Sequence, residues 1–225
     1  MHGFNQGVPA LRELCLRHKP DIFLVQEHWL LQSNLYKFNQ IFPDFYCYGS
    51  SAMDDSIKSG LLRGRPYGGV AILVANDLHR HSRLLTATDR YCVIRIFNCI
   101  IVNVYLPCVG TADRLLIVDE ILNDIASIFD DHSNCTFLLG GDFNCELDNV
   151  SDVSKLINSF ATESSLNRCD MLFGCSSATY VNTALNCHSH LDYFLFSDAS
   201  SLLSFNVFDD GSNVSDHLPL LLRFS

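Results

Sequence analysis

Residues 91–106 read YCVIRIFNCIIVNVYL, two apolar runs separated only by Asn98. Both runs are rich in β-branched residues and are short, so each is predicted to be a largely buried strand. Because a single polar residue separates them, the two strands are predicted to form a tight antiparallel hairpin within a mixed sheet.

Similar short apolar runs lie on both sides of this hairpin, and three other stretches have helical spacing. The further predicted strands are residues 21–26, 69–74, 135–140, 191–196 and 218–224. The predicted helices are residues 9–18, 112–131 and 153–160, and the second has an apolar face of Leu115, Val118, Leu122, Ile125 and Phe129. Strands interleaved with helices predict an α/β or α+β layered domain. No repeat or linker divides the sequence, so residues 1–225 are expected to form one domain.

Composition excludes several classes of protein. The chain has 225 residues, of which 48% are hydrophobic, so it is too apolar to be disordered. Its net charge of −10 argues against binding nucleic acid by bulk positive charge alone. No apolar run approaches the ~18 residues that span a bilayer, so no membrane partner is expected. The ten cysteines include no CxxC pair and are expected to be reduced, mostly buried thiols of an intracellular protein.

Polar residues fall at the ends of several predicted strands. These segments are residues 26–28 (QEH), 103–105 (NVY), 140–144 (GGDFN), Asp192 and residues 215–217 (SDH). Because strand ends converge on one crevice in layered α/β folds, we expect a single site there. The site would be rich in carboxylates, amides and imidazoles, which favours Mg²⁺ or Mn²⁺ and metal-assisted attack on a phosphate.

The order of these motifs resembles the endonuclease/exonuclease/phosphatase superfamily. The motifs are residues 26–27 (QE), 103–107 (NVYLP), 141–144 (GDFN), 191–193 (LDY) and 215–217 (SDH). Within that superfamily the chain is most similar to the apurinic-endonuclease-like nuclease domain of non-LTR (LINE-type) retrotransposons, through residues 3–7 (GFNQG), 26–30 (QEHWL) and 64–69 (GRPYGG). The resemblance implies a four-layered α/β sandwich, with two packed mixed sheets flanked by helices.

The resemblance also implies a metal site and a water-activating site. Glu27 would ligate the metal, Mg²⁺ or Mn²⁺, with Asn5 and Asp216 near the same ion. Asp142 would orient or deprotonate the attacking water. Asn144 would hold that water or the scissile phosphate.

A third implied group stabilises the phosphate. Tyr105 would donate a hydrogen bond to a phosphate oxygen. Asp192 and His217 would form a pair in which the carboxylate favours a charged imidazole, and this charge would balance the charge developing on phosphorus.

Nucleic-acid contacts are expected from two sources. Thr179 and Ser189 match positions that approach DNA or the catalytic residues in the retrotransposon branch, and His190 stands where an arginine is common. Arg63 and Arg65 lie in a glycine-containing loop and are expected to bind phosphates locally. Residues 79–83 (HRHSR) form a second basic cluster.

Taken singly, several of these residues also have a purely structural interpretation. Glu27 could be a solvated acid at a strand end, and Asp142 could form an Asx turn. Tyr105 could be a half-buried strand tyrosine, and Trp29 is expected to be a core or rim aromatic. Only four residues precede Asn5, where the family has a complete strand, so either that strand lies upstream of this sequence or Asn5 is poorly anchored.

We therefore expect a Mg²⁺-dependent DNA endonuclease that nicks one strand by water attack and leaves a 3′-hydroxyl. The expected partners are DNA and a reverse transcriptase region of the same polyprotein, and the protein is expected to be a nuclear monomer. Two alternatives remain open at this point. One is the same chemistry on RNA, poly(A) or a phosphoinositide, and the other is a catalytically silent binding domain.

Overall fold

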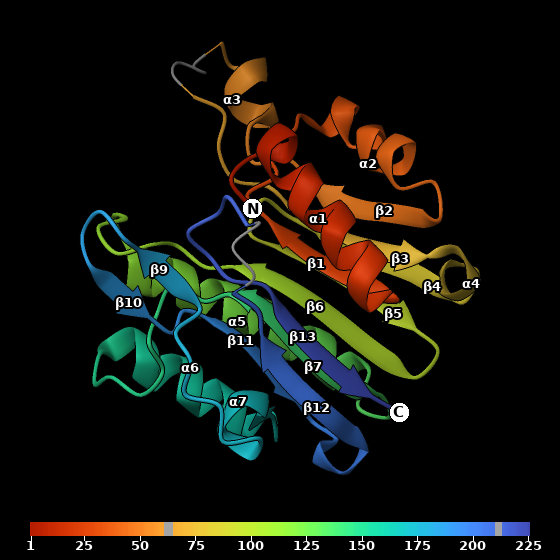
Figure 1. The fold of residues 1–225 in the computed structure, drawn as a ribbon. Coiled ribbons are helices and arrows are strands. Elements are labelled where there is room, and N and C mark those ends of the chain that lie inside the picture. Colours follow the sequence, from red (N-terminus) through yellow and green to blue (C-terminus); the bar gives the residue numbers. More distant parts are fainter. Residues whose placement is uncertain (61–64, 210–212) are drawn as a thin grey trace. The chain divides into compact units, whose positions relative to one another are not determined.

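The computed structural model describes residues 1–60, 65–209 and 213–225, and packing divides them into two compact units (Figure 1). The first unit contains Met1–Phe97 and Ile101–Tyr105 together with residues 213–215, and the second contains Asn98–Ile100 and the other described residues from Leu106 onward. Both units combine helices with β-strands, so the predicted α/β class is confirmed. Among the described helices, none has the length and apolar character needed to cross a membrane.

A three-stranded antiparallel sheet forms the centre of the first unit. Its strands are β1 (Ile22–Gln26), β3 (Val70–Ala75) and β2 (Phe45–Ser50), in the order β1-β3-β2. The central strand β3 is almost completely buried because it is apolar on both faces, as the sequence predicts for residues 69–74. Helices α1 (Phe4–His18) and α2 (Tyr36–Ile41) supply aromatic and aliphatic side chains to the same core.

Helix α1 begins five residues before the predicted start at Pro9. Pro9 lies inside the helix, although a proline there removes one backbone hydrogen bond. The first turn is stabilised by tertiary contacts instead. Phe4 is buried with its ring edge-on to Phe38, and the backbone N–H groups of Gly3 and Phe4 donate to the carbonyls of Glu27 and His28.

A buried amide connects the strands of this unit. Asn103, with no exposed surface, donates from Nδ2 to the carbonyls of Val25 and Ala71, both at 3.0 Å. Its Oδ1 accepts a hydrogen bond from the side chain of Gln26. All its polar atoms are therefore satisfied, as a buried amide requires.

The predicted hairpin at residues 91–106 is present as β5 (Tyr91–Ile96) and β6 (Cys99–Tyr105), neighbouring strands joined by a turn at residues 97–98. Strand β4 (Ser82–Ala87) pairs antiparallel with β5 and lies at the sheet edge. Short helices α3 (Asp54–Lys58) and α4 (Asn76–His79) and the 3₁₀ turn η1 (Gln32–Asn34) complete this unit.

In the second unit, β7 (Thr136–Asp142), β11 (Asp192–Phe196) and β8 (Asn167–Arg168) are antiparallel neighbours. Helix α5 (Arg114–Asp131) buries its apolar face except Leu115, which is exposed because it lies in the first turn. Its Phe129 stacks on Phe137 of β7 at 4.1 Å. Helix α6 (Asp152–Glu163) begins with a capping box in which Ser151 and Ser154 exchange side-chain-to-backbone hydrogen bonds.

Two further antiparallel pairs complete the second unit. They are β9 (Tyr180–Asn182) with β10 (Cys187–Ser189), and β12 (Leu202–Val207) with β13 (Leu220–Phe224). Helix α7 (Cys169–Leu172) and the 3₁₀ turn η2 (Ala199–Ser201) are short connections. All ten cysteines are free thiols in the structure.

Candidate active site

Two aspartates face each other across strands β7 and β11. Asp142 is the last residue of β7, and the antiparallel register places Asp192, the first residue of β11, directly opposite. Both residues are buried. Two buried carboxylates repel each other, so the pair requires a proton or a cation close by.

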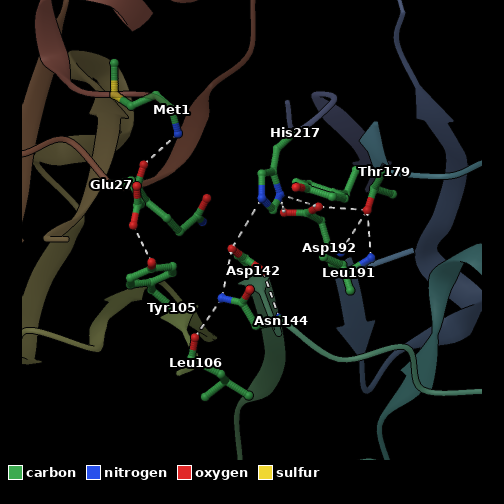
Figure 2. Close-up of polar contacts among 12 residues, drawn as sticks. Met1, Glu27, Tyr105, Leu106, Asp142, Asn144, Thr179, Leu191, Asp192 and His217 are labelled. Atoms are coloured by element: carbon green, nitrogen blue, oxygen red, sulfur yellow. Dashed lines mark hydrogen bonds and ion pairs between the residues drawn. The ribbon is translucent and has the colours of Figure 1, made fainter. Parts of the chain in front are cut away.

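His217 supplies that positive charge. Its Nδ1 lies 2.9 Å from Asp192 Oδ2 and 3.1 Å from Oδ1, and its Nε2 lies 3.8 Å from Asp142 Oδ2 (Figure 2). The ring packs against Tyr180, with centroids 5.1 Å apart, and a backbone bridge joins the two residues. The imidazole is thus held between two carboxylates.

The pKa values of Asp142 and His217 are both raised above their usual range. Burial, followed by the charge of Asp192, raises the pKa of Asp142 to about 7. Burial by itself would lower the pKa of His217, but the hydrogen bond and charge of Asp192 outweigh it, together with the charges of Asp142 and Asp216, and raise the pKa to about 9. At pH values between about 7 and about 9, Asp142 is an ionised carboxylate that can accept a proton, and it lies beside a protonated His217.

Thr179 fixes the position of Asp192. Its hydroxyl donates to Asp192 Oδ2 at 2.7 Å and accepts from the backbone N–H groups of Leu191 and Asp192, both at 2.9 Å (Figure 2). Thr179 has no exposed surface. A side chain without exposed surface does not reach DNA, and its hydrogen bond to Asp192 fits the other expectation, that Thr179 approaches the catalytic residues.

Asn144 holds Asp142 from the loop that follows β7. Its backbone N–H donates to Asp142 Oδ1 at 2.8 Å, and its Nδ2 donates to Asp142 Oδ2 at 3.2 Å and to the Leu106 carbonyl at 2.9 Å. A left-handed backbone at Asn144 (φ 49°) allows this geometry, and Arg114 braces it by donating to the Asn144 carbonyl. Within the described part of the chain, Asn144 Oδ1 makes no hydrogen bond and remains available to a ligand.

Ser189 is the last residue of β10 and His190 follows it, and backbone groups of both residues make hydrogen bonds that organise this region. The carbonyl of Ser189 accepts from the Thr179 N–H at 2.9 Å. The half-buried His190 ring stacks on Tyr193, with centroids 4.5 Å apart. Its Nε2 is buried and makes no hydrogen bond with a described residue, so His190 does not present this atom to solvent.

In the first unit, Glu27 directly follows β1 in a turn with unusual backbone angles. Glu27 and Trp29 both have positive φ values, 60° and 57°, which side chains of this size seldom adopt. The backbone N–H of Glu27 donates to the Gly69 carbonyl at 2.9 Å, and that of Trp29 donates to the Gly68 carbonyl at 3.0 Å. These bonds maintain the strained conformation and determine where the Glu27 side chain points.

His28 anchors the same turn from inside the core. It is fully buried, its Nε2 lies 3.1 Å from the Ser50 carbonyl, and its Nδ1 accepts from the Leu30 N–H at 3.0 Å. Burial lowers the pKa of His28 to about 4, so the ring is neutral at physiological pH. The ring lies against Gly69, where a Cβ atom would be 2.4 Å from it.

Two aromatic side chains hold the Glu27 carboxylate. The Tyr105 hydroxyl donates to Oε1 (Figure 2), and the Trp29 indole N–H donates to Oε2 at 3.2 Å. The expectation that Trp29 is only a core or rim aromatic misses this contact. The one sign of this contact in the sequence is that Trp29, which carries an indole N–H, lies two residues from the candidate metal ligand Glu27.

The remaining predicted residues are placed as follows. Asn5 lies exposed in the first turn of α1, and it forms no hydrogen bond with Glu27 among the residues described. Asp216 is half-buried and its carbonyl accepts from Val181 N–H at 2.7 Å. Arg65 is exposed, and Arg63 lies outside the described residues.

Two places have ligands suited to a divalent cation. Asp142, Asp192 and His217 each offer one ligand atom, and these atoms lie within 4.8 Å of one another. A cation there competes with the proton on His217. Glu27 accepts one hydrogen bond at each oxygen and, within the described ranges, has no ion-pair partner, so its carboxylate oxygens retain lone pairs for a hard cation.

Comparisons with known proteins identify the family of the chain. A profile of the Endonuclease/Exonuclease/phosphatase family matches residues 2–217. No curated protein sequence matches the chain.

Three solved structures are similar over almost the whole chain. An AP endonuclease from Archaeoglobus fulgidus has a TM-score of 0.74 and 13% identity, covering 99% of this chain and 96% of its own. A 3′ phosphatase from Neisseria, bound to a product DNA hairpin, has a TM-score of 0.70 and 17% identity, covering 100% and 96%. A 3′-5′ exonuclease from Neisseria meningitidis has a TM-score of 0.69 and 16% identity, covering 99% and 96%.

These likenesses confirm the expected fold. The match over residues 2–217 shows that the chain belongs to the endonuclease/exonuclease/phosphatase family and is a hydrolytic enzyme acting on phosphate esters.

Proposed function

We propose that the protein is a Mg²⁺-dependent DNA endonuclease that nicks one strand and leaves a 3′-hydroxyl, as LINE-type retrotransposon nucleases do. The observation that carries the proposal is the position of the half-buried His217 between the buried Asp142 and Asp192, which places a proton acceptor beside a fixed imidazolium. The names of the similar structures, an AP endonuclease and a 3′ phosphatase bound to DNA, favour DNA as the substrate.

Asp142 activates the attacking water in this proposal. With a pKa of about 7, its carboxylate is ionised above neutral pH and is basic enough to accept a proton from water. Asn144 holds that carboxylate through both backbone and side chain, and its own Oδ1, which has no hydrogen bond to any described residue, would orient the water or the phosphate.

His217 stabilises the charge that develops on the phosphate. Its Nδ1 is bonded to Asp192, and in this proposal its Nε2, which lies 3.8 Å from Asp142 Oδ2, donates to a non-bridging phosphate oxygen. Thr179 prevents Asp192 from rotating away, so the imidazolium is positioned before substrate binds.

We propose that Glu27 is a ligand of the metal ion, Mg²⁺ or Mn²⁺; roles for Asp216 and Asn5 stay predictions. When bound, the ion would supply Lewis-acid stabilisation of phosphate oxygens. Glu27→Gln and Asp216→Asn are each expected to weaken Mn²⁺ binding at least tenfold by isothermal titration calorimetry, while Asp130→Asn, at an exposed carboxylate on α5, leaves it unchanged. Unchanged affinity in both variants would show that the ion is held elsewhere.

Nicking of supercoiled plasmid tests the activity. Asp142→Ala and His217→Ala are expected to reduce nicking by at least 1000-fold, while Asp130→Ala removes a carboxylate from the same unit without effect. Circular dichroism melts verify that the variants remain folded. Robust nicking by both active-site variants refutes the mechanism.

Substrate class is tested separately. Intact protein is assayed on plasmid, abasic duplex, poly(A) RNA and inositol phosphates, and turnover is expected on DNA. Faster turnover of RNA or an inositol phosphate would keep the chemistry but refute DNA as the substrate. Mn²⁺ binding without turnover on any of them would instead indicate a silent binding domain.

The retrotransposon context is also part of the proposal. It is supported by residues 26–30 (QEHWL) and 64–69 (GRPYGG), and it places the enzyme in the nucleus beside a reverse transcriptase region. The nick must then end in a 3′-hydroxyl that a polymerase can extend. Radiolabelled nucleotide incorporation at the nick tests this, and a product that cannot be extended without phosphatase treatment argues against the context.

A further inference from the structure

The outer face of the β4–β5 pair combines two arginines with a stacked aromatic pair. We define the β4–β5 face as His81, Arg83, Arg95 and Phe97. Arg83 and Arg95 are direct cross-strand partners in the antiparallel register and therefore lie on the same side of the pair. The alternate residues of β5, Ile94 and Ile96, are buried on the opposite side.

The two arginines repel each other without compensation. Like charges directly opposite on paired strands are destabilising. Neither Arg83 nor Arg95 has an acidic partner in the described part of the chain; Arg95 Nε donates only to the Phe97 carbonyl, at 2.9 Å. In a chain with 25 acidic and 15 basic residues, two adjacent unpaired arginines form a local surface for anions.

The aromatic pair extends this surface. The rings of His81 and Phe97 are stacked, with centroids 4.4 Å apart and planes at 27°. Phe97 remains 56% exposed although it is a large apolar side chain. An exposed ring beside guanidinium groups is the combination that binds a nucleobase and the neighbouring phosphates.

This face is distinct from the Glu27–Tyr105 end of the first unit. The Tyr105 N–H donates to the Arg90 carbonyl at 2.7 Å, so the start of β5 lies beside Tyr105. Phe97 follows at the far end of the same strand, roughly 20 Å away at the usual rise per residue. A ligand on the β4–β5 face therefore does not occupy the Glu27 site.

We propose that the β4–β5 face is a second, non-catalytic binding site for unpaired nucleic acid. The arginines would contact consecutive phosphates and Phe97 would stack on a base. Duplex DNA does not offer an unstacked base to Phe97, so the site favours single strands. DNA and RNA single strands share this chemistry, and the test separates them.

Fluorescence anisotropy of labelled dT20, U20 and a 20-bp duplex, in EDTA to prevent cleavage, measures binding to the full chain. Arg83→Gln/Arg95→Gln is expected to weaken single-strand binding and to reduce the slope of log K against log salt by about 1.4, because each phosphate contact contributes ~0.7. Phe97→Ala is expected to weaken binding roughly tenfold with little change in slope.

The control is Arg12→Gln/Arg17→Gln, which removes the same charge from exposed positions on α1. It is expected to leave single-strand affinity and slope unchanged. Equal losses in the control, or no loss in Phe97→Ala, would overturn the proposal. If Arg83→Gln/Arg95→Gln self-associates on size exclusion while its oligonucleotide binding is unchanged, the arginines only protect an edge strand and the proposal is wrong.

A nicking assay tests the β4–β5 face separately from the proposed catalytic residues. Plasmid nicking by Arg83→Gln/Arg95→Gln, measured at saturating DNA, is expected to stay within twofold of the intact protein. Loss of nicking with single-strand binding intact would place these arginines in the catalytic site and overturn the second-site proposal.

Discussion

Replacing Asp192 by asparagine should remove the charge that keeps His217 protonated. The substitution retains the size of the side chain and an oxygen that can accept from Nδ1. It removes the anion 2.9 Å from that nitrogen. What remains is burial, which lowers the pKa of His217, opposed only by the charges of Asp142 and Asp216.

The size of the effect follows from the two pKa values. In the intact protein the pKa of His217 is about 9, so about 90% of the imidazole is charged at pH 8. In Asp192→Asn the pKa should fall to about 6.5 or below, so about 3% is charged at that pH. Activity that depends on the imidazolium should therefore be about 30-fold lower at pH 8.

Two measurements test this prediction. NMR titration of the His217 ring protons in metal-free protein should show the pKa fall by more than two units, with Asp130→Asn as control. In the nicking assay, kcat/KM of the intact protein should rise through about pH 7 as Asp142 ionises and fall through about 9 as His217 loses its proton. An alkaline limb that stays near 9 in Asp192→Asn would refute the assignment of that limb to His217.

Two further predictions concern stability. Gly69→Ala should destabilise the protein by roughly 2–4 kcal/mol, because it combines a positive φ (88°) with a Cβ only 2.4 Å from His28. The control Gly110→Ala, with φ 91° but open space around the Cβ, should cost about 1 kcal/mol. Equal free energies of unfolding for the two variants in urea denaturation would show that the His28 contact is unimportant. Thr179→Val should cost roughly 2–3 kcal/mol, because it leaves two backbone N–H groups and one oxygen of Asp192 without their buried partner. A melting temperature within 1 °C of the intact protein would contradict the second prediction.

Much of the fold could be predicted from hydrophobic patterns, and the failures have physical causes. Strand β3 is predicted because five consecutive residues are apolar and buried. Strand β2 is missed because only Phe45 among its residues is buried. Strand β4 is missed because an irregularity between Leu84 and Thr86 interrupts its alternation and an exposed arginine lies within it.

The candidate site, like the fold, could be predicted from the sequence only in part. Asp142, Asp192 and His217 could be named from their motifs, but the pairing of two strands 50 residues apart decides that the carboxylates face each other. The contact of Trp29 with Glu27 depends on left-handed backbone conformations that local propensity disfavours for bulky residues. Such conformations are maintained by tertiary hydrogen bonds, which a local pattern does not encode.

Asn103 has a consequence for how the chain reaches its native pairing. Its amide matches the carbonyls of Val25 and Ala71, which are opposite each other only when β1 and β3 are aligned as observed. If β1 and β3 paired one residue out of register, this amide would be buried without hydrogen-bond partners, and each unmatched group would destabilise the sheet by about 1–3 kcal/mol. An apolar residue at position 103 would not penalise a shift in the register of β1 and β3. The carboxamide therefore favours the observed alignment of β1 and β3 over alignments shifted by one residue.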